Sequence, residues 1–166
     1  MIVLIGAMGA GKTTVGGLVA GRLGRRLRDT DHDVEASTGR TISDIFVEDG
    51  EAAFRALERA AVTEALSTHD GVLSLGGGAV LDPGTRDLLA GHDVVFLRVG
   101  LSDAVKRVGL GSARPLLLGN VRGRIKALLD ERTPIYESVA TLVVETDGRS
   151  AEDVAAEIVT ALAATA

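Results

Sequence analysis

A glycine-rich segment near the start of the chain, Gly6-Ala7-Met8-Gly9-Ala10-Gly11-Lys12-Thr13, constrains the fold most. It fits the pattern G-x-x-x-x-G-K-[ST], follows the apolar run of residues 2–5 and leads into a helical pattern over residues 13–22. Backbone N–H groups of such a loop point into one concavity, and with the N-terminus of the following helix they favour a polyphosphate. The segment therefore predicts a strand, a phosphate-binding loop and a helix, with a nucleoside triphosphate as ligand.

The side chains of this loop have predicted roles of their own. Lys12 would reach the β- and γ-phosphates and act in catalysis, and the hydroxyl of Thr13 would ligate Mg²⁺. The run Val72–Leu75 ends in glycines, not in the aspartate that often completes such a metal site. Asp29, at the end of its own short strand, is the best candidate for that role, acting on Mg²⁺ through water. The nucleotide-binding residues predicted from the loop are Gly9, Ala10, Gly11, Lys12, Thr13 and Thr14.

Length and composition limit the class of protein. The 166 residues suffice for one domain, residues 1–166, and are too few for two. The net charge of −5 without a basic cluster argues against a nucleic-acid partner or a membrane surface. The sequence contains no cysteine, which excludes disulfides and thiolate metal sites. The short apolar N-terminus lacks the cationic start of a signal peptide, and no apolar run is long enough to cross a membrane, so we expect a cytoplasmic protein.

Apolar strands alternate with helical patterns along the chain, which indicates an α/β fold. The predicted strands cover residues 2–5, 27–29, 72–75, 93–99 and 142–146. Together they predict a three-layer α/β/α domain with a five-stranded parallel sheet. Ligands of such sheets lie beyond the carboxyl ends of the strands. The phosphate loop, the Asp29–Asp31 segment and Gly76–Gly78 are all expected there, in one crevice.

Several local signals predict where helices begin or break. Thr41, Asp82-Pro83, Ser102 and Ser150 are expected at helix starts, and a long helix is expected from about Gly50 to Thr68. Residues 132–136 contain a proline in a helical segment, so a loop or a kink is expected there. Residues 109–119 follow neither a helical nor a strand period. Their glycines and the Arg114-Pro115 pair suit either a mobile lid or an ordinary surface loop.

Other residues suit a second substrate, although each has a plainer interpretation. Arg55 and Glu58 share a helix face, which equally describes a solvated surface pair. The glycines at 76–78 suit close approach of a ligand to the backbone, or a flexible turn. In an extended Asp29–Asp31 segment both carboxylates would face the crevice. Asp31 would then accept the hydrogen bond of the acceptor hydroxyl, as a general base or by orientation alone, unless one of the two aspartates only caps a helix.

The ordered set of these motifs resembles the shikimate kinase family over nearly the whole chain. The resemblance rests on the phosphate loop, Asp29-Thr30-Asp31, Phe54-Arg55 with Glu58, Leu73–Gly78, Arg114-Pro115-Leu116 and Arg132-x-Pro-x-Tyr136. It implies a fold of the P-loop kinase type with a mobile lid. It also implies MgATP-dependent phosphorylation of the 3-hydroxyl of shikimate, a step toward chorismate, by a monomeric enzyme. It also implies a shikimate site formed by Asp31, Arg55, Glu58, Gly76, Gly77, Gly78 and Arg132.

The same resemblance implies contacts to ATP from Arg114, a catalytic lid residue, and from Arg149, while Arg107 would share the adenine platform. The segment Asp147–Ala151 lacks the proline that some family members have after this arginine, so the preference for ATP is taken from the family. Two alternatives remain at this point. One is another small-metabolite kinase, such as a gluconate kinase, and the other is a nucleotide-binding regulator without activity.

Overall fold

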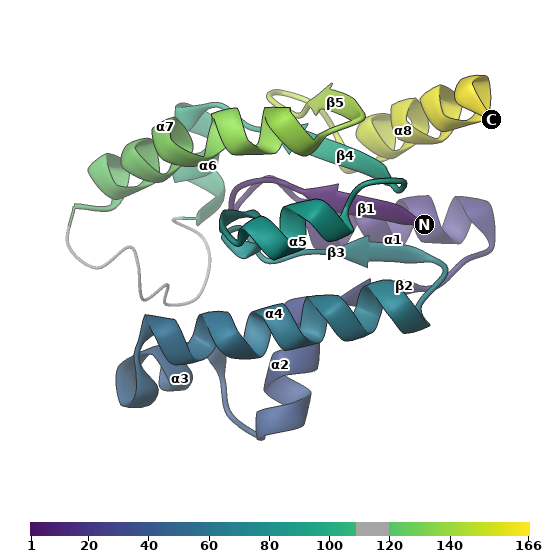
Figure 1. Ribbon diagram of the computed structural model, residues 1–166. Helices are drawn as coiled ribbons and strands as arrows, with labels where there is room; N and C mark the ends of the chain where they lie inside the picture. Colours follow the sequence, from purple (N-terminus) through teal and green to yellow (C-terminus); the bar gives the residue numbers. More distant parts are fainter. Residues whose placement is uncertain (109–119) are drawn as a thin grey trace.

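A single sheet of parallel strands organises the computed structural model, which describes residues 1–108 and 120–166. The strand order is β2-β3-β1-β4-β5 (Figure 1). The strands are β1 (Ile2–Ile5), β2 (Leu27–Asp29), β3 (Val72–Ser74), β4 (Asp93–Arg98) and β5 (Leu142–Glu145). All five predicted strands are therefore confirmed, and β1, which precedes the phosphate loop, lies at the centre of the sheet.

Helices cover both faces of this sheet, as the α/β prediction required. They are α1 (Lys12–Leu23), α2 (Thr30–Thr38), α3 (Ile42–Asp49), α4 (Glu51–Thr68), α5 (Pro83–Leu88), α6 (Leu101–Val108), α7 (Val121–Val139) and α8 (Ala151–Thr165), with a short 3₁₀ helix η1 (Ala79–Leu81). Helices α1 and α8 pack on each other behind the sheet, and α5 and α7 lie in front of it (Figure 1). Helices α2 and α3 pack on α4 at the β2 end of the sheet.

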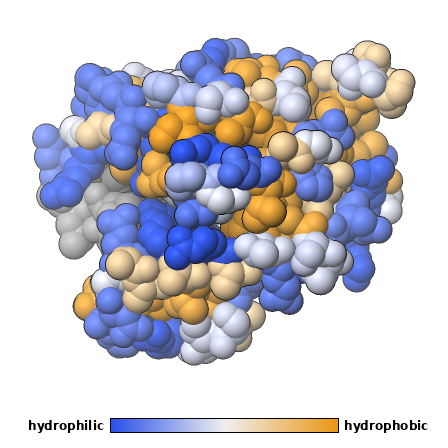
Figure 2. Space-filling model, in the orientation of Figure 1, coloured by the Kyte–Doolittle hydropathy of each residue, from blue (hydrophilic) through white to orange (hydrophobic). Residues whose placement is uncertain are grey.

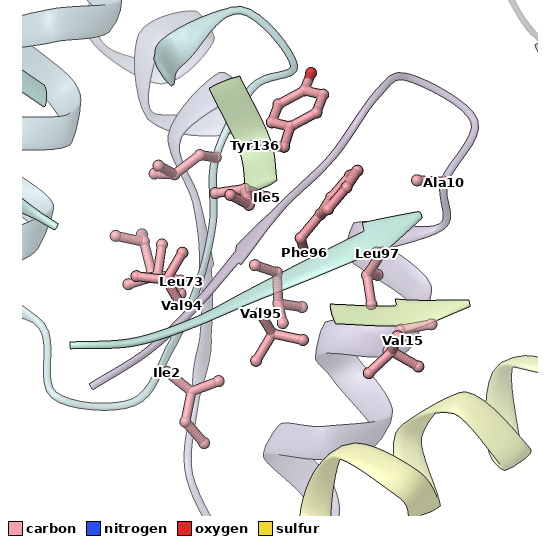
Figure 3. Packing of buried hydrophobic residues seen from close by; sticks show 14 of the residues in the cluster. Ile2, Ile5, Ala10, Val15, Leu73, Val94, Val95, Phe96, Leu97 and Tyr136 are labelled. Atoms are coloured by element: carbon pink, nitrogen blue, oxygen red, sulfur yellow. The ribbon is translucent and has the colours of Figure 1, made fainter. Parts of the chain in front are cut away.

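The core explains why the strands are apolar throughout instead of alternating. Both faces of a parallel sheet are covered, so every residue of β1 is buried, as are Val94–Leu97 of β4. Figure 3 shows these side chains packed with Val15 of α1 and Tyr136 of α7. A second, smaller cluster, formed by Val34, Ile45 and Phe54, holds α2, α3 and α4 together. Figure 2 shows hydrophilic and hydrophobic residues mixed over the face that carries α5, and Leu88 of α5 is itself exposed.

Three of the four predicted helix starts are confirmed. The side chains of Thr41, Asp82 and Ser150 each accept a hydrogen bond from the backbone N–H three residues later. The prediction for Ser102 was wrong, because α6 already begins at Leu101. The carbonyl of Gly100 accepts the first helical hydrogen bond, from the N–H of Ala104, which places Ser102 inside the helix.

Two further expectations need correction. Of the loop or kink expected over residues 132–136, the loop was wrong, because α7 is continuous from Val121 to Val139 with Pro134 inside it. The proline removes one helical hydrogen bond, and the helix continues past it to place Tyr136 in the core. The chain is also not extended through Asp31, because α2 begins at Thr30. Asp29 caps this helix, and its carboxylate accepts the N–H of Asp31 at 2.9 Å.

The described residues include no helix that is long and apolar enough to cross a membrane. The predicted lid over residues 109–119, including Arg114, lies outside the residues that the structure describes.

Candidate active site

The phosphate loop connects β1 to α1 in a conformation that only glycine adopts readily. Gly6, Gly9 and Gly11 have φ angles of 149°, 82° and 92°. A Cβ atom on Gly6 would lie 2.7 Å from the carbonyl oxygen of Leu97, so the loop also needs glycine there for space. No side chain caps the N-terminus of α1. The first N–H groups of that helix are thus positioned as an anion site requires.

The charged and hydroxyl side chains of the loop are close to its backbone and to Asp29. The ammonium group of Lys12 donates hydrogen bonds to the carbonyl oxygens of Gly6 (2.7 Å) and Ala7 (3.1 Å). The hydroxyl of Thr13 donates to Oδ2 of Asp29 at 2.9 Å. Asp29 thus uses one carboxylate oxygen to cap α2 and the other to contact the residue predicted to ligate Mg²⁺.

A cavity of about 570 Å³ lies beside the phosphate loop, beyond the carboxyl ends of β1, β2 and β3. It brings together the three segments that the sequence placed in one crevice. Its lining is Met8 and Thr13 from the loop, Asp29, Asp31, His32 and Glu35 around α2, Thr41, Ile42, Ser43 and Phe46 around α3, Phe54, Arg55 and Glu58 from α4, Gly76–Gly78, and Arg132 from α7. All seven residues of the predicted shikimate site line this cavity.

Arg55 and Glu58 form an ion pair inside this cavity and not on a solvated face. Nη1 of Arg55 donates to Oε1 of Glu58 at 2.8 Å, and Nη2 lies 3.2 Å from Oε1 of Glu51. Glu58 is only 3% exposed, and its burial raises the pKa of its carboxyl, which Arg55 opposes. Arg132 is also buried, and its Nε has no hydrogen-bond partner in the described part of the chain. The two arginines thus give the cavity a positive region suited to a carboxylate.

The surroundings of Asp31 disfavour the ionised form of its carboxyl group. Burial raises the pKa of its carboxyl to about 6, and the nearby carboxylates of Asp29 and Glu58 add to this effect. Lys12 acts in the opposite direction and favours the carboxylate. A pKa near 6 leaves Asp31 mainly ionised at neutral pH and still basic enough to accept a proton from a bound hydroxyl.

The glycines at 76–78 make room for the site's own side chains. A Cβ atom on Gly76 would lie 2.8 Å from both Oδ1 of Asp31 and Oε2 of Glu58. One on Gly78 would lie 2.4 Å from Nη1 of Arg55. Gly76–Gly78 therefore do not form an isolated flexible turn, and Arg55 and Glu58 are not a surface pair, because the two segments pack against each other. Gly76 and Gly78 thus leave space that two carboxylates and a guanidinium occupy, whereas a Cβ on Gly77 would make only ordinary contacts, at 3.5 Å or more.

Tyr136 is a residue of this site whose role the sequence reasoning did not assign. Its hydroxyl donates a hydrogen bond to the carbonyl oxygen of Gly77, and its ring packs on Phe96 with a centroid distance of 5.0 Å. Figure 3 shows the hydroxyl pointing away from the core side chains. Its position in Arg132-x-Pro-x-Tyr136, one helical turn from an arginine, was the available signal. Phe54 had a similar signal in its position beside Arg55, whereas the sequence reasoning assigned no role to Phe46, which also lines the cavity.

Two of the predicted nucleotide-side arginines, Arg107 and Arg149, belong to the described residues, and neither lines this cavity. Arg107, on α6, donates hydrogen bonds to the carbonyl oxygens of Gly9 and Thr146, at 3.0 Å each. Arg149, after β5, donates to the carbonyl oxygen of Glu145 at 2.8 Å and pairs with Glu157 at 2.7 Å. Arg107 therefore contacts the phosphate loop directly, whereas the contacts of Arg149 are with β5 and α8.

A phosphate loop at the end of the central strand of a parallel sheet, beside a cavity with acidic and arginine side chains, defines a P-loop kinase. The model of the shikimate kinase family matches residues 8–163. A shikimate kinase of Thermobifida fusca is 62% identical over 159 residues, which cover 96% of this chain and 92% of that relative. The chain belongs to the shikimate kinase family.

Solved structures agree with this assignment. A shikimate kinase from Acinetobacter baumannii in complex with shikimate superposes with a TM-score of 0.95 at 38% identity, covering 99% of this chain and 93% of that one. A gluconokinase from Sinorhizobium meliloti reaches a TM-score of 0.62 at 20% identity, covering 99% and 92% of the two chains. This second likeness shows a shared fold alone. The predicted family, its kinase activity and the P-loop fold are confirmed, and gluconate kinase is the less supported alternative.

Proposed function

We propose that this chain transfers the γ-phosphoryl group of ATP to the 3-hydroxyl of shikimate with the residues described above. The observation that carries the proposal is the shared cavity, in which Asp31, Arg55 and Arg132 face the same space as Thr13 of the phosphate loop. A kinase must hold its acceptor in line with the transferred phosphate, and a single cavity beside the loop satisfies that requirement.

The acceptor would be held by charge and by backbone. Shikimate offers a carboxylate, which Arg55 and Arg132 would bind, and vicinal hydroxyls, which Asp31 and the Gly76–Gly78 backbone would bind. Planar guanidinium groups match a carboxylate by paired hydrogen bonds. Glu58 would act mainly on Arg55, because its carboxylate already accepts a hydrogen bond from that guanidinium at 2.8 Å.

The nucleotide would bind along the phosphate loop, next to this cavity. The backbone of residues 9–14 would bind the phosphates, and Lys12 would leave the carbonyl oxygens of its own loop to contact the β- and γ-phosphates. Arg149 would contact ATP from the segment that follows β5. Arg114 would stabilise charge on the transferred group, as an arginine finger does. We further propose that the enzyme acts as a monomer, which light scattering of the purified protein would test.

The donor set around Thr13 fits a magnesium ion. Hydroxyl and carboxylate oxygens are the ligands that Mg²⁺ prefers, and Thr13 and Asp29 place two of them 2.9 Å apart. Among the described residues there is no group of three or more histidine or acidic side chains suited to a metal, which agrees with an ion held mainly by phosphate oxygens and water. When bound, the ion would neutralise charge on the transferred phosphate.

Asp31 would receive the hydrogen bond of the 3-hydroxyl and orient its oxygen toward the γ-phosphorus. The new bond forms from that oxygen, the bond to the bridging oxygen of ADP breaks, and the hydroxyl proton leaves along the hydrogen bond to Asp31. Because the transition state of phosphoryl transfer is loose, orientation of the nucleophile is the larger part of this role.

A coupled ADP-release assay with shikimate, gluconate and a nucleoside monophosphate tests the proposal. Of the three acceptors, we expect only shikimate to be turned over, at a rate on the order of 1–100 s⁻¹ as in other kinases. Arg55→Lys should raise the KM for shikimate and leave that for ATP nearly unchanged. Arg59→Lys is the matched control, since Arg59 is one turn away on α4 and pairs with Asp82 at 2.9 Å outside the cavity. Equal background rates with all three acceptors would contradict the proposed substrate.

A further inference from the structure

Arg107 connects two loops that are far apart in the sequence. From α6, its Nη1 donates to the carbonyl oxygens of Gly9 (3.0 Å) and Ala10 (3.4 Å) in the phosphate loop. Its Nη2 donates to the carbonyl oxygen of Thr146 (3.0 Å) after β5, and lies 3.6 Å from Oδ2 of Asp103 one turn earlier on α6. One guanidinium group therefore joins the phosphate loop to the residue that follows the carboxyl end of β5.

Both ends of this connection are held by the rest of the fold. Thr146 is buried, and its hydroxyl donates to the carbonyl oxygen of Arg98 at 2.8 Å, so it offers Arg107 a fixed acceptor. Helix α6 packs directly on the phosphate loop. A Cβ atom on Gly9 would lie 3.1 Å from Cγ2 of Val108 and 3.4 Å from the carbonyl oxygen of Ala104. The guanidinium thus acts across a close-packed contact with little room for adjustment.

We infer that Arg107 is a positioning residue for the phosphate loop, which it holds in its phosphate-binding conformation by its carbonyl groups. The N–H and C=O of a trans peptide group point in opposite directions. When Arg107 holds the carbonyl of Ala10 toward α6, the N–H of Gly11, in the same peptide group, is turned to the opposite side of the loop. The inference rests on the proposed nucleotide site and deepens it, because it assigns Arg107 a role in phosphate binding beyond any contact with adenine.

The geometry requires an arginine. Five acceptor atoms surround the two Nη atoms: one each on Gly9, Ala10 and Asp103, and both the carbonyl and the hydroxyl oxygen of Thr146. A lysine carries its positive charge at a single point and cannot reach both loops at once. The flat face of the guanidinium is not used by these edge contacts, so they are compatible with a base stacked on it.

Calorimetric titration of AMP and ADP against the wild-type protein, Arg107→Gln and Arg107→Lys tests the inference. The measured quantity is the ratio of the ADP affinity to the AMP affinity, which reports how well the loop receives the β-phosphate. We expect Arg107→Gln to lower this ratio about tenfold, as expected for the loss of charge-assisted hydrogen bonds, and Arg107→Lys to restore only part of it. Shikimate affinity without nucleotide should stay at the wild-type value.

The neighbouring Lys106→Gln is the control, because Lys106 is exposed and its removal changes the charge of α6 equally. It should leave the ratio unchanged. Three results would overturn the inference: equal losses of AMP and ADP affinity in Arg107→Gln, which indicate an adenine contact alone; the same ratio change in Lys106→Gln, which indicates net charge; or a joint loss of shikimate binding and thermal stability, which indicates a general structural role. A wild-type protein that does not bind ADP would instead refute the proposed nucleotide site.

Discussion

Replacing Asp31 by asparagine should stabilise the ligand-free protein while abolishing its activity. In the wild-type protein burial raises the pKa of this carboxyl, and Asp29 and Glu58 raise it further. Ionisation of Asp31 therefore costs more free energy in the folded chain than in the unfolded chain. Asparagine has a similar shape without the charge, so the variant should avoid this cost. Its amide oxygen can still accept a hydrogen bond, but it is neither charged nor basic enough to take the proton of the substrate hydroxyl.

The size and the pH range of the effect follow from the pKa. Below about pH 4 the carboxyl is protonated in both the folded and the unfolded chain, and between pH 4 and 6 the unfolded chain ionises first. The wild-type protein therefore loses stability as the pH rises through this range, and the loss is complete above it. A rise from 3.8 to about 6 corresponds to at most about 3 kcal/mol. Because the side chain is partly exposed, we expect about 1–2 kcal/mol.

Urea unfolding of both proteins at pH 4 and pH 8 measures this difference. The free energy of unfolding of Asp31→Asn should exceed that of the wild type by about 1–2 kcal/mol more at pH 8 than at pH 4. Asp33→Asn is a control on the same helix, because Asp33 accepts an ion-paired hydrogen bond from Arg28 at 2.6 Å and its loss should not stabilise the protein at pH 8. A stability difference that is the same at both pH values would refute the electrostatic reasoning, and normal turnover by Asp31→Asn would refute its role in catalysis.

Four further outcomes are expected. Arg55→Lys should raise the KM for shikimate about tenfold to a hundredfold, measured by steady-state kinetics, because it removes a desolvated charge-assisted pairing. Gly78→Ala should raise the same KM with little change in thermal stability, since its Cβ would meet only the mobile end of Arg55, 2.4 Å away; an unchanged KM would contradict this. Tyr136→Phe should weaken shikimate binding in calorimetry but not ADP binding, because its hydroxyl contacts the carbonyl of Gly77. Asp29→Asn should raise the Mg²⁺ concentration needed for half-maximal activity, and a wild-type requirement would show Asp29 to be only a helix cap.

Local sequence patterns were sufficient for the sheet and most helix starts. A buried parallel strand is a short apolar run, so strand β4 was predictable. A helix cap needs only one side chain three residues before its backbone partner, so the caps at Thr41, Asp82 and Ser150 were predictable as well. The errors came from local signals that were given the wrong weight. The capping side chain of Asp29 ends the extended segment early, and Pro134 is accommodated inside the continuous helix α7.

What the sequence by itself determined was the phosphate loop, the family and seven of the residues that line the cavity beside that loop, because these depend on residue types in a fixed order. The tertiary structure alone decided how those residues act on one another. Burial of Glu58 beside Arg55, the crowding of Gly76 against Asp31 and the connection from Arg107 to Gly9 join segments that are distant in the sequence. The pKa of Asp31 has the same origin, since desolvation and neighbouring charges exist only after the chain has folded.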